Sequence, residues 1–450
     1  MRTQLLVPFE GPGSGTEELS WAQRSMWASI TREGSSITLG GTFALPEGTS
    51  EDVIAAGLRF LFGRHQALRT RYEIQPDASL RQVLYSSGEF SIALVDAADR
   101  DPAVVAEELH DAYQTKDFDY PNEWPLRMAV VKKDGRASYV VAVYLHLALD
   151  AGGLRALLAD LASMDPETGE SPNEITASQP FDQARWQRTP AAVRQSAASL
   201  RHLEKILRTV SLHRFLGPEA EGEPSFPRLD FQSPATRLAV RAISQRLSVD
   251  TSQILLALFG IAVTRITGNN PFLTILAVSN RFRPGFADSV SQLAQVSPCM
   301  IDFADCTLDE AIGRARRAAV SAYKYGYYNP VDRRALIEQI NADRGAKVDM
   351  SCIFNDRRTE RDLNSEPVSA EQIRAALPDS VLNWPIGVEE IPETIYFSVD
   401  DAEDAVRFEL SADIRYLPRE RMEELARSIE TLAVQAALEP GASTLIHTAP

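Results

Sequence analysis

One apolar stretch limits the fold of this chain more than any other segment, because it ends in a histidine and a turn of small residues. Residues 139–147 are almost wholly apolar, which indicates a buried β-strand. His146 lies near the end of this strand, and Asp150 follows four residues later, ahead of two glycines. The glycines let the backbone turn tightly, so we expect a helix over residues 154–161.

The role of His146 stays open at this level. An imidazole held at the end of a strand can accept a proton near neutral pH, as a general base does. A core histidine whose ring nitrogens are satisfied by neighbours would show the same local pattern. One histidine and one aspartate make a weak motif, so the local sequence supports both interpretations.

The predicted elements divide the chain into two mixed α/β halves. Residues 126–132 and 138–147 form a predicted hairpin with Asp134-Gly135 at its turn. Residues 165–179 are rich in Pro, Glu, Thr, Ser and Asn, which is typical of a linker. We therefore predict an N-terminal lobe over residues 1–170 and a C-terminal lobe over 171–450. In the second lobe the patterns predict a helical region over 181–215, a loop over 217–227, a strand over 237–243 and a helix over 251–266 that is closed by Gly268.

Composition excludes several classes of function. The chain has 450 residues, a formal net charge of −16 and a pI of about 5.0, which argues against a general nucleic-acid binder. Its three cysteines lack the spacing of a metal site and indicate free thiols in a reducing compartment, so we expect a cytoplasmic protein without a metal. No stretch resembles a signal peptide or a membrane span, and we expect no membrane partner.

Several separate segments occur in the order found in one enzyme family. Residues 19–27 (LSWAQRSMW) and 64–72 (RHQALRTRY) resemble the first two motifs of nonribosomal peptide synthetase condensation domains, the second of which is written loosely as RHExLRTxF. Residues 145–151 (LHLALDA) occupy the place of the HHxxxDG motif, and residues 278–281 (VSNR) resemble a family segment that ends in an arginine after a strand. This resemblance covers nearly the whole chain.

The resemblance implies a fold, a site and a set of partners. The fold is α/β, with two chloramphenicol-acetyltransferase-like lobes in a V and an active-site tunnel at their junction. A donor thioester enters on the phosphopantetheine arm of an acyl or peptidyl carrier protein, and an amine, an alcohol or a carrier-bound acceptor enters from the other face. The family binds no metal and no cofactor of its own. His146 matches the catalytic second histidine, and Asp150 is expected to pair with Arg281 of the second lobe.

The chain departs from the family motif at two positions. Leu145 replaces the first histidine, whose role in the family is mainly architectural. Ala151 replaces the motif glycine, which permits a backbone conformation or a close approach that a methyl group would hinder, and Gly152 is expected to compensate in part. The His-Gln dipeptide usual near the end of the 308–325 helix is also absent. These departures indicate a divergent member and leave an inactive one open.

Other residues within the motifs have simpler structural interpretations. We expect Arg64 and Arg69 to be structural salt-bridge partners, and His65 to end a helix near the negative end of its dipole. Ser20 is a predicted helix N-cap, and Cys299 lies in an apolar strand where a thiol is inert.

Three functions follow from these observations. The first is a free-standing condensation enzyme of natural-product biosynthesis that joins a carrier-bound acyl or aminoacyl thioester to an amine or hydroxyl; Met1 and the ending 448–450 predict a self-contained chain. The second is a degenerate condensation-like domain that binds carrier proteins and recruits a tailoring enzyme, which the altered motif favours. The third is an acyltransferase that uses a soluble acyl-CoA. The joint presence of His146, Asp150 and Arg281 favours catalysis over recruitment.

Overall fold

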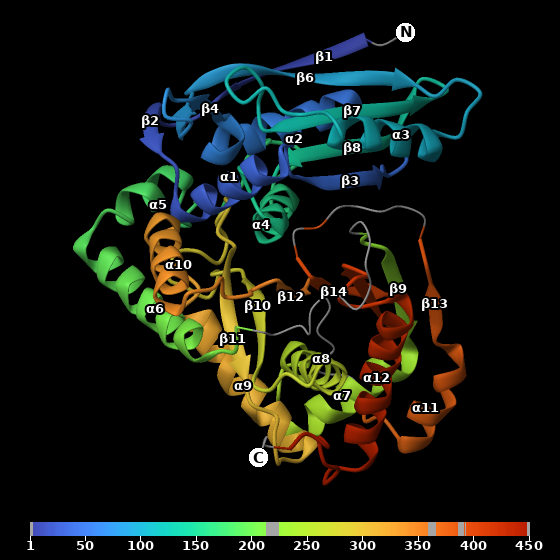
Figure 1. Cartoon of the computed structure of the whole chain (residues 1–450). Coiled ribbons are helices and arrows are strands. Elements are labelled where there is room, and N and C mark those ends of the chain that lie inside the picture. Colours follow the sequence, from blue (N-terminus) through green and yellow to red (C-terminus); the bar gives the residue numbers. More distant parts are fainter. Residues whose placement is uncertain (1–2, 213–224, 359–365, 386–390, 392, 448–450) are drawn as a thin grey trace. The chain divides into compact units, whose positions relative to one another are not determined.

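The chain forms two compact units, each of which is built from two separate segments of the sequence (Figure 1). The computed structural model describes residues 3–212, 225–358, 366–385, 391 and 393–447. The first unit contains residues 1–196 and 279–295, and the second contains 197–278 and 296–450. The chain therefore passes between the units three times.

A five-stranded sheet forms the centre of the first unit, in the order β1-β6-β7-β8-β3 (Figure 1). Alternate residues of its strands pack against helices on opposite faces, as the two-residue period of a strand requires. Val130 and Ala142 lie in the core with α2 and α4, whereas Ala129, Val131 and Val141 lie in the core with α3. The strands are β1 (Thr3–Glu10), β3 (Thr38–Ala44), β6 (Ser87–Asp96), β7 (Leu126–Lys133) and β8 (Arg136–Leu145).

A second, smaller sheet and a set of helices complete the first unit. The small sheet has the order β2-β5-β4, with strands β2 (Gly15–Glu18), β4 (Thr70–Ile74) and β5 (Leu80–Leu84). The helices are α1 (Trp21–Glu33), α2 (Glu51–Arg64), η1 (Gln66–Arg69), α3 (Pro102–Gln114), α4 (Ala151–Ala162) and α5 (Pro180–Trp186). Helix α6 (Pro190–Thr209) begins in the first unit and ends in the second.

The second unit is built on a seven-stranded sheet in the order β11-β10-β12-β14-β15-β9-β13 (Figure 1). One face packs on α7, α8, α9, α11 and α12 in the largest hydrophobic core of the described chain. Helix α8 is apolar on all sides and its middle is buried throughout, as expected for a central core helix. Its strands are β9 (Arg228–Ser233), β10 (Phe272–Val278), β11 (Gln295–Ile301), β12 (Cys352–Asp356), β13 (Val381–Asn383), β14 (Ile395–Ala402) and β15 (Ala405–Ala412). Its helices are α7 (Pro234–Leu247), α8 (Thr251–Thr267), α9 (Leu308–Lys324), α10 (Pro330–Arg344), α11 (Ala370–Ala375), η2 (Leu377–Asp379) and α12 (Arg419–Leu438).

Most predicted elements are confirmed, and one is wrong. The hairpin of β7 and β8 turns at Asp134-Gly135, and α8 ends at Gly268 in the left-handed conformation. The strand predicted over residues 237–243 is instead the middle of α7. Its buried residues recur at helical spacing, and Ser233 caps the helix ahead of Pro234.

Other expectations need smaller corrections. The helical region predicted over 181–215 is two helices, α5 and α6, separated at residues 187–189, and it ends at Thr209. Residues 213–215 of it, and most of the loop predicted over 217–227, lie outside the described residues. Residues 165–179 contain no helix or strand, but they lie within the first unit and do not join the two units.

The compact units differ from the expected lobes of residues 1–170 and 171–450. Residues 171–196 and 279–295 belong to the first unit, although both lie in the expected second lobe. Within the described residues, no single helix is long and apolar enough to cross a membrane; α7 and α8 reach that length and apolarity only together, with a bend of 115° between them.

Candidate functional site

His146 lies in the turn that follows β8, in the first unit. Its backbone N–H donates to the carbonyl oxygen of Ile37 at 2.9 Å, and the next turn is closed by the bond from Ala148 N–H to Leu145 O at 2.9 Å. The side chain is half-buried, and its Nδ1 is buried without a hydrogen-bond partner among the described residues.

Asp150 is the centre of the hydrogen bonds that hold this turn. Its Oδ1 accepts from the backbone N–H of Gly153 at 2.7 Å and from Arg281 Nη2 at 2.6 Å. Its Oδ2 accepts from the backbone N–H groups of Leu293 and Ala294, each at 2.9 Å. The carboxylate therefore caps the N-terminus of α4 and has both oxygens satisfied, as a buried charge requires.

Arg281 forms the ion pair that the resemblance implied. Besides Asp150, its guanidinium donates to the carbonyl oxygen of Ser289 at 2.7 Å and to that of Ser291 at 3.2 Å. The side chains of Arg281 and Asp150 are only 12% and 5% exposed. The resemblance placed Arg281 in the second lobe, but the structure groups it with the first unit, so the pair closes inside one compact unit.

Gly152 and Gly153 allow the segment of residues 279–295 to approach α4 closely. A Cβ atom on Gly152 would lie 1.9 Å from Arg281 Nε, and one on Gly153 would lie 2.9 Å from the carbonyl oxygen of Ser291. Ala151 is exposed and is the first residue of α4, outside the left-handed region. The close approach that was expected to need a glycine at position 151 therefore occurs at position 152, one residue later.

Asn280 fixes the start of the same segment to its end. It is fully buried with φ of 59°, a left-handed conformation that asparagine tolerates well. Its side-chain amide donates to the carbonyl oxygen of Leu293 at 3.0 Å. The segment is thus a compact loop that presents the Leu293 and Ala294 amides to Asp150.

The other ionisable groups of the motifs have structural roles. Burial raises the pKa of Tyr144 to about 12, so its phenol stays protonated near neutral pH, and burial likewise raises the pKa of Cys299 to about 12. Arg69, which was expected to form a salt bridge, is instead fully buried and donates to the backbone carbonyls of Pro12 and Tyr85. Among the described residues no group of three or more His, Cys, Asp or Glu could hold a metal ion.

Arg64, His65 and Ser20 also act as expected. Both Arg64 and His65 bind Asp160, at 2.9 Å and 2.8 Å, and His65 ends α2. Ser20 caps α1 by accepting from the N–H of Gln23 at 3.3 Å.

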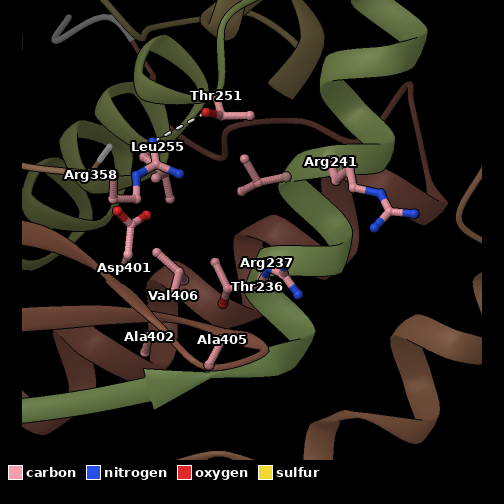
Figure 2. Close-up of a pocket in the computed structure, with 11 residues that line it drawn as sticks. Thr236, Arg237, Arg241, Thr251, Leu255, Arg358, Asp401, Ala402, Ala405 and Val406 are labelled. Atoms are coloured by element: carbon pink, nitrogen blue, oxygen red, sulfur yellow. Dashed lines mark hydrogen bonds between the residues drawn. The ribbon is translucent and has the colours of Figure 1, made fainter. Parts of the chain in front are cut away.

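A cavity of about 50 Å³ lies in the second unit (Figure 2). Arg358 lies against it, donating to Thr251 Oγ1 at 3.2 Å and to both oxygens of Asp356 at 2.7 and 2.9 Å. Arg237, which also lines it, pairs with Asp404 at 3.1 Å. These arginines are already neutralised, and none of the predicted site residues lines this cavity.

Sequence reasoning missed several residues that hold the site. Gln183 of α5 is 1% exposed, and its amide Nε2 donates to Ser291 Oγ at 2.8 Å and to Ser289 Oγ at 3.1 Å. The backbone amides of Leu293 and Ala294 carry no side-chain signal at all. None of these contacts is visible in a local pattern, because each depends on residues more than 100 positions apart in the chain.

Comparisons with known proteins agree with the motifs. The family model of the condensation domain matches residues 14–374, which is most of the chain. Cyclosporin synthetase of Tolypocladium inflatum is 25% identical in an alignment of 333 residues that covers 71% of this chain and 2% of that protein. A probable non-canonical nonribosomal peptide synthetase of Salinispora arenicola is 26% identical in an alignment of 368 residues that covers 73% of this chain and 4% of that protein. The chain thus spans a small part of the curated relatives it matches.

Solved structures of the same fold cover almost the whole chain. The SgcC5 protein of Streptomyces globisporus has a TM-score of 0.69 and 18% identity, over 95% of this chain and 100% of that one. The X-domain in complex with OxyB from teicoplanin biosynthesis has a TM-score of 0.70 and 17% identity, over 97% and 96%. The first condensation domain of the CDA synthetase has a TM-score of 0.67 and 11% identity, over 96% and 98%. The fold is that of the chloramphenicol-acetyltransferase-like condensation domains, and the chain belongs to the condensation-domain family.

Proposed function

We propose that this protein is a condensation-type acyltransferase that joins a carrier-bound acyl or aminoacyl thioester to an amine or hydroxyl acceptor, with His146 as the catalytic residue. The proposal rests on one arrangement. The backbone around His146 is held by the Asp150–Arg281 ion pair and by main-chain hydrogen bonds. Nδ1 is buried without a hydrogen-bond partner among the described residues, and the proposal takes Nε2 as the ring nitrogen that contacts the substrate.

The proposed reaction needs few protein groups other than His146. The acceptor nitrogen or oxygen attacks the thioester carbonyl, a C–N or C–O bond forms, and the C–S bond breaks. His146 positions the acceptor and moves its proton to the departing sulfur of the phosphopantetheine arm. That arm belongs to the carrier protein, and the proposal includes no metal or cofactor bound by this chain.

The two motif departures are compatible with this chemistry. Leu145 is 1% exposed in a hydrophobic cluster with Leu147, so it fills the core where the family has its architectural histidine. Ala151 is accommodated in the first turn of α4, as described above.

Recruitment of a partner enzyme is the second candidate. It is favoured by the similarity to the teicoplanin X-domain, whose solved complex contains OxyB, at a TM-score of 0.70. On this alternative the chain binds a carrier protein and a second enzyme without transferring an acyl group.

Intact-protein mass spectrometry of loaded carrier proteins tests the proposal. Acyl-carrier substrates are incubated with amine or alcohol acceptors, with and without the protein, and acyl-CoA donors form a parallel series. We expect His146→Ala to lower transfer about 10²–10⁴-fold, the usual contribution of a general acid–base, while the fold survives. His110→Ala, which changes a histidine on α3 of the same unit, is the matched control and should transfer at the wild-type rate.

The outcomes separate the three functions. Undiminished transfer by His146→Ala would refute the catalytic assignment. Transfer from acyl-CoA but not from any carrier would identify the soluble-thioester alternative. A wild-type protein that transfers nothing and yet binds a loaded carrier together with a partner enzyme would establish recruitment.

A further inference from the structure

A buried polar cluster on α5 holds the loop that carries the Asp150 contacts. Gln183 is 1% exposed, and its amide Nε2 donates to Ser178 O at 3.2 Å, Ser289 Oγ at 3.1 Å and Ser291 Oγ at 2.8 Å. Ser289 Oγ donates to Ser178 O at 2.6 Å, and the two serine hydroxyls lie 2.7 Å apart. Since a carbonyl only accepts, Ser289 uses its proton on Ser178, and Ser291 donates to Ser289.

The orientation of the Gln183 amide is fixed by these partners. The Ser178 carbonyl cannot donate, so the amide must point its NH₂ group, not its oxygen, toward the cluster. Its Oε1 has no hydrogen-bond partner among the described residues. An unpaired buried acceptor costs free energy. The Gln183 side chain therefore makes its bonds to Ser289 and Ser291 while its own Oε1 stays without a partner among the described residues.

Ser291 connects this cluster to the site. Its side chain binds Gln183, and its carbonyl oxygen accepts from the backbone N–H of Asp150 at 3.4 Å and from Arg281 Nη2 at 3.2 Å. Two and three residues later, the amides of Leu293 and Ala294 bind Asp150 Oδ2. A shift of Ser291 would therefore move three of the four groups that donate to the Asp150 carboxylate, namely Arg281 and the Leu293 and Ala294 amides. That carboxylate lies four residues after His146.

We propose that Gln183 is a positioning residue for the transfer reaction, which acts through Ser291 and Asp150 on the turn that carries His146. The inference rests on the proposed function, because it assigns Gln183 a role in that reaction. Gln183 does not touch His146 or a substrate. Its effect comes from fixing where the 279–295 loop holds Asp150, and misplacement of a catalytic group by about 1 Å costs on the order of 10²-fold in rate.

Helix α5 offers a matched control. Gln187 is also buried, at 5% exposure, and caps the end of the same helix. Its Oε1 accepts from the backbone N–H of Trp21 at 2.7 Å, which ties this end of α5 to α1. Gln183→Leu and Gln187→Leu each remove one buried amide from α5, and the first breaks the bond to Ser291 Oγ.

The proposal is tested by steady-state transfer kinetics with a loaded carrier and an amine acceptor. The rates are measured well below the melting temperature of each variant. We expect Gln183→Leu and Ser291→Ala to lower kcat about 10- to 100-fold with little change in KM for the carrier. The double variant should lose no more than Gln183→Leu alone, because both changes cut the same link. Gln187→Leu should keep kcat within about twofold, even if it melts earlier.

Hydrogen–deuterium exchange of the full-length variants gives a readout that does not depend on turnover. Exchange at the Leu293 and Ala294 amides should be faster in Gln183→Leu and unchanged in Gln187→Leu. An active enzyme whose Gln183→Leu variant has wild-type kcat or unchanged exchange at these amides would overturn the positioning role alone. A wild-type protein that transfers nothing from any donor would overturn the proposed function, and the catalytic role of Gln183 with it.

Discussion

Gly152 is the residue at which the smallest change should have the largest effect. The guanidinium of Arg281 crosses the backbone of α4 at this point, and a Cβ atom would lie 1.9 Å from its Nε. Gly152 has ordinary helical backbone angles, so its conformation does not require a glycine. The glycine is required because the Arg281 side chain lies where a Cβ atom would be.

We therefore expect Gly152→Ala to displace Arg281 and to leave Asp150 without its counter-ion. Breaking a buried ion pair costs roughly 3–5 kcal/mol, so urea denaturation should show a loss of that size. Ala151→Gly, one residue earlier, is the control and should change the unfolding free energy by about 1 kcal/mol or less. Equal stability of Gly152→Ala and the wild type would contradict the packing described for this helix end.

At the scale of elements, the end of α2 is tied to α4 by one carboxylate. Asp160 accepts from Arg64 Nε at 2.9 Å and from His65 Nε2 at 2.8 Å. Burial alone would raise the pKa of Asp160, but the hydrogen bonds and charges of His65 and Arg64 outweigh it and lower the pKa to about 2. Helix α4 therefore begins at Asp150 and is secured near its other end by Asp160.

This lowered pKa makes a contribution to stability that depends on pH. The unfolded carboxyl titrates near 3.8, so the contribution is complete above that pH and is lost as the pH falls through about 2. Asp160→Asn should lower the unfolding free energy at pH 7 by roughly 2 kcal/mol, and the gap from the wild type should shrink as the pH falls toward 2. Denaturant melts across this range measure it, with the exposed Asp111→Asn as the control. A gap that does not change with pH would exclude the ion pair as its cause.

The elements also show how far the sequence predicts the structure. The N-cap of α1 at Ser20 is a local feature and was predicted correctly. The helix predicted over residues 154–161 is present as α4, but it begins earlier, at Ala151, because Asp150 caps it. The error at α7 arose because residues 237–243 were taken alone, without Ser233 and Pro234, which mark a helix start. The ion pair of Asp150 with Arg281 was implied by the family resemblance, and the structure contains it.

The remaining contacts of the site had no sequence signal. Leu293 and Ala294 act through backbone amides, which every residue except proline possesses. Gln183 and Ser291 meet across more than 100 residues, so only the folded chain brings them together. Sequence patterns identify residues whose chemistry is distinctive, and they miss ordinary polar groups that matter because of where they lie.

For the molecule as a whole, the first unit is incomplete without residues 279–295. Residues 1–196 contain Asp150 and Gln183, but their partners Arg281 and Ser291 arrive from a later part of the chain. A boundary drawn after residue 170 would separate Asp150 from Gln183 as well as from Arg281.

This division predicts a complementation experiment. A fragment of residues 1–196 should be less stable than the first unit is in the full chain, and a synthetic peptide of residues 279–295 added to it should raise its melting temperature. The same peptide with Arg281→Ala, or the fragment with Asp150→Ala, should give a much smaller shift. Equal stabilisation by the wild-type and Arg281→Ala peptides would show that the ion pair does not hold this segment.

The late arrival of residues 279–295 has a consequence for synthesis on the ribosome. Their two ends join β10 and β11, which are neighbours in the sheet of the second unit. About 100 residues separate residue 196, the end of the first segment of this unit, from residue 295, the end of the loop. At a synthesis rate of roughly 5–20 residues per second, the loop is completed roughly 5–20 s after residue 196. During that interval the nascent first unit exposes an Asp150 carboxylate without its arginine. Chaperone demand and proteolytic sensitivity should therefore peak before residue 295 emerges, and mutations in the loop should reduce yield in cells more than they reduce the stability of protein that has already folded.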